Sequence, residues 1–321
     1  MDNFYSHICS KINDSFSFNG ENLCHYTSPI ALNEILKNKA LRFTDYRFLN
    51  DTTEGTYIYD VIASLDLSVY DEGFKKAIEN LKNRRFTVSE IVNYRLSDIS
   101  HSEKYYLGTE YRYFLCSFSV DENNLAMWNY YTKTPNGMGY NIVLYTIDLE
   151  KNFAKSLSEF STVSELSFKK VIYDRNHQKD IVKFILDNYY EEWKKPNNEE
   201  KVENSLYKTI DEVKLYIKNP CFAIENEVRA IVKMSSVEYE KMLSPDGMIN
   251  VVEKNGYFVP YFDLCFGDTE DLASVTISPK GENPFFNQSL RILLNKYGYR
   301  FSKITNSKIP LRWQEDKNNA D

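Results

Sequence analysis

The chain has 321 residues, of which 42% are hydrophobic and 26% are charged, and its formal net charge is −7. This composition is typical of a globular protein with a core that needs neither disulfides nor metal. Five cysteines without a Cys-x-x-Cys pair argue against a zinc site or a disulfide framework, and no apolar run is long enough to span a membrane. The first residues lack the pattern of a signal peptide, so we expect a cytoplasmic protein with reduced thiols and no membrane association.

Helix and strand patterns then follow in irregular order. A short helix is expected over 4–14 and a strand over Leu23–Thr27, after which Ser28 and Pro29 supply a helix start. Apolar runs predict further strands at 40–44, 111–120, 136–149, 166–174, 226–234, 257–264 and 273–278. Helical spacing predicts further helices over 53–107, 123–131, 176–218 and 285–297, and a loop is expected at 45–51.

Grouped strands separated by two long helical blocks predict an α+β fold in a single domain over 1–321. The core strands are expected within 22–52, 111–174 and 221–313. The helical blocks, about 53–107 and about 176–218, are expected to be insertions into this core.

The first candidate site is His25-Tyr26-Thr27-Ser28, at the junction of a strand and a helix. A lone histidine beside aromatic residues is commonly structural. A helix N-terminus, however, attracts anionic ligand groups. The local sequence alone favours the structural interpretation of His25.

The second candidate is the loop that ends in Asn50 and Asp51. These two residues suit a ligand contact, but Asp51 and Glu54 also fit a helix capping box. Arg42 and Arg47 flank the loop. Each could pair with a phosphate or lie on the surface.

The third candidate is the aromatic run that contains Trp128, Tyr130 and Tyr131. Aromatic residues at helical spacing are usually core residues, and this is the interpretation for Trp128. A tyrosine of the run could instead present its face to a planar cationic ring.

The fourth candidate is Glu225 and Glu227, followed by Arg229. On a strand these three residues share one face. Two carboxylates on one face of an apolar strand are costly to bury, so at least one is expected to face a cleft.

Several motifs occur together in order: HYTS with L..IL, RFLND..E, FLCSFS, MWNYY, E.EVR and SKIPLR. In these motifs the chain, from about Leu23 to Arg312, resembles the bacterial family called domain of unknown function 2971. The opening strand–helix motif also resembles the start of ADP-ribosyltransferase-fold enzymes with a His–Tyr–Glu site. The second resemblance implies a split β-sheet core and NAD as the substrate.

By this resemblance His25 would contact a ribose hydroxyl of NAD, with Tyr26, Thr27 and Ser28 beside it. Glu227 would be the catalytic glutamate, and Glu225 would activate the acceptor.

The resemblance also implies an aromatic residue against the nicotinamide. Tyr130 and Tyr131 are both candidates, with Trp128 as a third. The middle motif lies on a helix here, whereas the better-known enzymes use a strand tyrosine. Arg42 or Arg47 would meet the pyrophosphate.

The function implied is NAD cleavage with transfer of ADP-ribose to nucleic acid or protein, or hydrolysis of NAD. A toxin or anti-phage effector follows by analogy, with an antitoxin or defence-system protein as its partner. A non-catalytic binding module, with the strand acids salt-bridged to Arg229, is the alternative. A metal-dependent nuclease is disfavoured, because Arg229 stands where such sites use a lysine, and no metal is expected.

Overall fold

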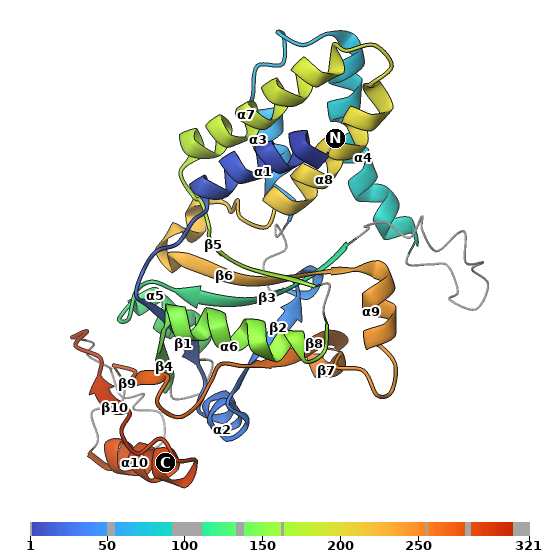
Figure 1. The fold of residues 1–321 in the computed structure, drawn as a ribbon. Coiled ribbons are helices and arrows are strands. Elements are labelled where there is room, and N and C mark those ends of the chain that lie inside the picture. The colour runs from blue at the N-terminus through green and yellow to red at the C-terminus, as the bar shows by residue number, and fades with distance from the viewer. Residues whose placement is uncertain are drawn as a thin grey trace, which may run out of the picture.

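The computed structural model describes residues 2–49, 55–91, 111–132, 138–161, 164–254, 256–279 and 284–310. Within them, ten strands form one mostly antiparallel sheet with helices packed on it (Figure 1). The strands are β1 Asn22–Thr27, β2 Ala40–Asp45, β3 Tyr111–Ser119, β4 Tyr140–Tyr145, β5 Glu165–Lys170, β6 Glu227–Ser235, β7 Asn250–Lys254, β8 Tyr257–Cys265, β9 Leu272–Ile277 and β10 Lys303–Asn306. The predicted α+β class is confirmed.

The helices fall mainly between the strand groups. They are α1 Asp2–Ser15, α2 Pro29–Asn38, α3 Tyr57–Ala63, α4 Glu72–Ile91, α5 Leu125–Tyr131, α6 Thr146–Ser158, α7 Arg175–Trp193, α8 Glu199–Val213, α9 Ser236–Met242 and α10 Pro284–Lys296, with 3-10 helices η1 Tyr46–Phe48 and η4 Pro220–Glu225. None of these helices has the length and hydropathy of a membrane span.

The strand predicted over 136–149 is wrong over its last four residues, because α6 begins at Thr146. The apolar residues Leu149, Phe153 and Leu157 recur at helical spacing and are all buried, so a continuous apolar run concealed a change of period. The strand β7, the short strand β10 and the helix α9 were not predicted.

The centre of the sheet is β3, and the sheet forks along one of its edges. On one edge β6 pairs with β3 over its whole length, from Tyr111 to Ser119. The other edge is shared, since β1 pairs at Ser119 and β2 pairs at Phe114 and Leu115. The strands β1 and β2 therefore diverge around Ser117, which lies between the two paired stretches.

The two helical blocks pack against each other on one side of the sheet. Figure 1 shows α1, α3, α4, α7 and α8 gathered beyond β5 and β6. Their apolar residues form one cluster that reaches the sheet at Leu115 and Ile231. Its fully buried members include Ile8, Ile58, Phe74, Ile78, Ile185, Leu186, Leu206 and Ile210. Helical blocks far apart in sequence thus share one core with the N-terminal helix.

The opposite face of the sheet packs against α2, α6 and α10 through a second cluster, which includes Phe43, Phe153 and Leu294. A smaller cluster joins Tyr26 of β1 to Met127 and Trp128 of α5.

Candidate functional site

A cavity of about 280 Å³ lies where β1 and β2 diverge from β3. Residues from β1, β2, β3, α5, η4, β6 and β7 line it. Six of the predicted site residues are among them: His25, Tyr26, Arg42, Tyr131, Glu225 and Glu227. The fork of the sheet therefore brings together residues from distant parts of the chain.

The turn before β6 sets the positions of the two acids. Asn219 caps η4 by accepting the N–H of Cys221 at 3.0 Å, and Pro220 follows at the first helical position. Asn226 ends η4 in the left-handed region with φ 43°, which asparagine tolerates better than most residues. Glu225 is therefore on η4 and not on the strand, which corrects the prediction that it shares a strand face with Glu227.

Glu227 opens β6 and is held by two cations. Arg229 donates from Nε to Oε1 at 2.9 Å and from Nη2 to Oε2 at 2.8 Å, and Lys218 Nζ lies 3.3 Å from Oε2. Only 5% of Glu227 is exposed. Burial by itself would raise the pKa of Glu227, but Arg229 and Lys218 outweigh it and bring that pKa to about 2. Glu227 is thus a fixed carboxylate at physiological pH.

Arg229 is itself anchored from the helical side of the sheet. It is 1% exposed, and its Nη1 donates to the carbonyl of Leu215, just after α8, at 2.6 Å. Because all five donors of a guanidinium lie in one plane, this third contact fixes the orientation of the Arg229 guanidinium that binds Glu227.

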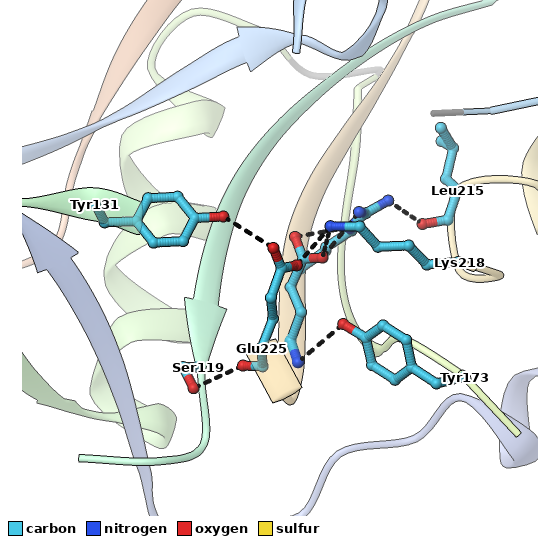
Figure 2. Close-up of polar contacts among 8 residues, drawn as sticks. Ser119, Tyr131, Tyr173, Leu215, Lys218 and Glu225 are labelled. Carbon is cyan, nitrogen blue, oxygen red and sulfur yellow. Dashed lines mark hydrogen bonds and ion pairs between the residues drawn. The ribbon is translucent and has the colours of Figure 1, made fainter. Parts of the chain in front are cut away.

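Glu225, which Figure 2 shows beside Tyr131 and Lys218, has a different environment from Glu227. Lys218 Nζ donates to its Oε2 at 2.5 Å and Tyr131 Oη donates to its Oε1 at 3.4 Å. Ser119 Oγ donates to the Glu225 carbonyl at 2.8 Å. Burial raises the pKa of Glu225, with Lys218 opposing the rise. Two neighbouring acids with pKa values pushed apart are an arrangement that suits acid–base chemistry.

His25 is half-buried at the fork. Its Nδ1 lies 3.0 Å from the carbonyl oxygen of Ser117, where neither β1 nor β2 pairs with β3. Since a carbonyl can only accept, Nδ1 carries the proton in this contact. Burial lowers the pKa of His25, so the ring is neutral and Nε2 is a hydrogen-bond acceptor.

Tyr26 lines the cavity but also has a structural part. Its Oη donates to the carbonyl of Asp121 at 2.6 Å and accepts the N–H of Asn124 at 3.0 Å. Its ring meets Trp128 edge-on, with centroids 4.7 Å apart. Trp128 is 3% exposed and does not line the cavity. This agrees with the interpretation of Trp128 as a core residue.

The other candidate residues of the His25–Ser28 motif and of the aromatic run, namely Thr27, Ser28 and Tyr130, do not line the cavity. Thr27 is buried, and Ser28 caps α2 by accepting the N–H of Ala31 at 3.2 Å. Tyr130 is 54% exposed. Of the two tyrosines that the sequence left open, Tyr131 is the one at the cavity.

The two candidate arginines, Arg42 and Arg47, have different positions relative to the cavity. Arg42 lines the cavity, whereas Arg47 does not and is bound to Asp45, with Nε at 2.9 Å from Oδ1 and Nη2 at 2.5 Å from Oδ2. A bidentate pair with a buried carboxylate leaves Arg47 a structural role. Asn50 and Asp51 lie outside the described residues.

Sequence reasoning missed Lys218 and Tyr173. Tyr173 Oη accepts the N–H of Glu227 at 3.4 Å, and Lys218 bridges the two acids. The one available signal was a lysine that ends the apolar run Leu215–Ile217, since a buried lysine requires an anionic partner. Among the described residues, no group of His, Cys, Asp and Glu could hold a metal ion.

Comparison with known families gives one match. Residues 127–230 match the model of a family described as protein of unknown function (DUF2971). No curated protein and no solved structure matches the chain significantly, so the expected resemblance to ADP-ribosyltransferase-fold enzymes has no support from these comparisons. The matched segment contains Tyr131, Lys218, both acids and Arg229, while His25 and Arg42 precede it. Over residues 127–230, which carry the charged end of the cavity, the chain is similar to the DUF2971 family.

Proposed function

We propose that the protein cleaves the nicotinamide–ribose bond of NAD in the cavity at the sheet fork and transfers ADP-ribose to an acceptor or to water. The observation that carries the proposal is the meeting of His25, Tyr131, Glu225 and Glu227 on one cavity.

In this proposal Glu227 stabilises the transition state. Departure of nicotinamide with the bonding electrons leaves an oxocarbenium-like ribose. A carboxylate that is already ionised and held by Arg229 needs no reorganisation to meet that charge. Preorganised electrostatic groups of this kind contribute about 3–4 kcal/mol each.

The neighbouring residues supply orientation and proton transfer. His25 Nε2 accepts a hydrogen bond from a ribose hydroxyl, and the Tyr131 ring packs against the nicotinamide. Burial raises the pKa of Glu225, which suits this residue to proton transfer. The oxygen of the acceptor hydroxyl or of water bonds to the ribose carbon, and Glu225 takes the proton from that oxygen.

The nature of the acceptor, nucleic acid or protein, and a toxin or anti-phage role with an antitoxin or defence-system partner, rest on the resemblance alone.

A second candidate is a non-catalytic binding module. The observation in its favour is that both oxygens of Glu227 are bound to Arg229 in a site with 5% exposure. A pair of this kind can also be a buried structural ion pair.

Nicotinamide release from NAD, measured for the wild type and Glu227→Gln, separates the candidates. RNA, DNA and a protein extract are supplied in turn as acceptors. The variant keeps the shape of the side chain and one acceptor oxygen, and we expect a loss of about 100-fold or more. Asp211→Asn is the matched control, since it removes a buried acid that pairs with Lys214 outside the cavity and should retain activity.

The outcomes are distinct once circular dichroism shows that each variant is folded. Release by the wild type and the control, but not by Glu227→Gln, supports NAD cleavage. Binding of NAD by calorimetry without release by the wild type favours the binding module. If the wild type neither releases nicotinamide nor binds NAD, both candidates are refuted.

A further inference from the structure

Asn124 lies between β3 and α5 and contacts three elements that carry residues of the candidate site. Its side-chain oxygen accepts the N–H of Ala126 at 2.9 Å and that of Met127 at 3.4 Å, and this caps α5. Its Nδ2 donates to the carbonyl of Ile224 in η4 at 2.6 Å. Its backbone N–H donates to Tyr26 Oη of β1 at 3.0 Å. One residue therefore joins α5, η4 and β1.

The amide oxygen of Asn124 fixes the start of the helix that carries Tyr131. The helix α5 has seven residues, and Tyr131 is the last of them. A helix this short is not stable by its own hydrogen bonds, because nucleation is costly, so it depends on its cap and its packing. Since a helix rises about 1.5 Å per residue, the place where α5 begins also sets the place of Tyr131.

The amide nitrogen of Asn124 holds the turn that carries Glu225. The Ile224 carbonyl belongs to the planar peptide unit that joins Ile224 to Glu225. The next carbonyl, that of Glu225 itself, accepts from Ser119 Oγ at 2.8 Å (Figure 2). The backbone is therefore held on both sides of the Glu225 Cα, by Asn124 on one side and by Ser119 on the other.

The contact between the two held elements is a long one. Tyr131 Oη donates to Glu225 Oε1 at 3.4 Å (Figure 2), whereas O–H···O bonds usually measure about 2.5–3.0 Å. At about 3.6 Å the contact would no longer be a hydrogen bond. It therefore depends on the spacing of α5 and η4, and the Asn124 amide holds both of them.

We infer that Asn124 is a positioning residue of the candidate site, which holds the Tyr131 hydroxyl within reach of the Glu225 carboxylate. Asn124 does not line the cavity, so it acts through these two residues and not on a ligand. An amide suits this role because it accepts through its oxygen and donates through its nitrogen. Its second donor contact, to Asp121 Oδ2 at 3.3 Å, stays within the loop before α5.

Crystal structures of the wild type, Asn124→Ser and Asn124→Asp measure this positioning directly and need no substrate. Serine and aspartate are both good N-cap residues, so α5 keeps its cap. Neither replaces the donor to Ile224, because the ionised carboxylate has no proton and the serine side chain is shorter. We expect the distance from Tyr131 Oη to Glu225 Oε1 to exceed about 3.6 Å in both variants.

Asn198→Ser is the matched control. Asn198 stands at the N-cap position of α8, donates from Nδ2 to the carbonyl of Glu192 at 3.0 Å, and does not line the cavity. The control should keep the contact between Tyr131 and Glu225 as in the wild type. The inference is overturned if the wild type lacks the contact, if both Asn124 variants keep it, or if the control loses it equally.

The pH dependence of nicotinamide release is a readout that a merely structural role of Asn124 would not move. A hydrogen bond donated to a carboxylate favours its ionised form, so loss of the Tyr131 contact raises the pKa of Glu225. Because a base must be ionised to accept a proton, the acid limb of kcat/KM should move to higher pH in Asn124→Ser, by about half a unit or more. Tyr131→Phe should move this limb similarly, and the double variant no further. All these variants keep the other charged groups that act on Glu225, which are Lys218, Glu227 and Arg229.

The inference rests on the proposed function only in the roles given to Tyr131 and Glu225, so the two can fail separately. If the wild type releases no nicotinamide and the contact is lost in the Asn124 variants alone, the reaction is refuted and the positioning is supported. If the wild type releases nicotinamide, both variants keep the contact and the acid limb does not move, the positioning is overturned and the reaction stands.

Discussion

Replacing Lys218 by methionine removes the cation between two buried carboxylates while keeping most of the side-chain volume. The Nζ atom lies 2.5 Å from Glu225 Oε2 and 3.3 Å from Glu227 Oε2, and the Lys218 side chain is 8% exposed. Arg229 continues to neutralise Glu227, so the main loss is at Glu225. Removing one partner of a buried ion pair costs about 3–5 kcal/mol, and we expect the free energy of unfolding to fall by that amount at neutral pH.

The deficit should depend on pH, with a sign set by Glu225. Burial raises the pKa of Glu225 and Lys218 opposes this, so loss of Lys218 raises that pKa further. A carboxyl with a higher pKa in the folded than in the unfolded state, where it is about 4.3, binds more protons when folded. The folded state therefore gains stability as the pH falls through the raised pKa, and the deficit of Lys218→Met shrinks toward acid pH.

Urea unfolding followed by circular dichroism, at about pH 7.5 and about pH 5.5, measures both effects. Adding Glu225→Gln to Lys218→Met should recover at least half of the loss, because no uncompensated charge remains. The control is Lys183→Met, which breaks the exposed pair with Asp187 and should cost about 1 kcal/mol or less. An equal deficit at both pH values, or no recovery in the double variant, would refute the reasoning.

Two further predictions concern the same region. The pKa of Glu227 falls from 4.5 to about 2, which corresponds to about 3 kcal/mol of stability that is present above the unfolded pKa and is lost as the pH falls toward 2. Unfolding free energies measured between pH 6 and pH 3 should therefore drop less steeply in Glu227→Gln than in the wild type, and equal slopes would contradict this. Tyr26→Phe removes the hydroxyl between the Asp121 carbonyl and the Asn124 N–H and should cost about 1–3 kcal/mol in urea unfolding. Tyr130→Phe, at an exposed neighbour, should change nothing, and a similar loss in both variants would speak against a specific contact.

Local signals in the sequence predicted much of the fold correctly. Ser28 followed by Pro29 predicted the start of α2, and the Ser28 hydroxyl does cap that helix. The prediction failed where the period changed within one apolar run, at Thr146, since strand and helix share the same residue types there. Glu225 was assigned to the strand because the left-handed conformation of Asn226 has no strong signature in a sequence.

The sequence alone singled out His25, Glu225 and Glu227, the residues that we propose carry the chemistry, since a histidine within an apolar strand and two acids before an arginine stand out by composition and spacing. Only the tertiary structure decided their partners. Lys218 and Tyr131 reach Glu225 from different segments of the chain. Arg42 pairs with Asp263 and Arg47 with Asp45, and only Arg42 lines the cavity. The physical reason is that propensity and periodicity act over a few residues, whereas the fork at β3 arises from strand pairing across most of the chain.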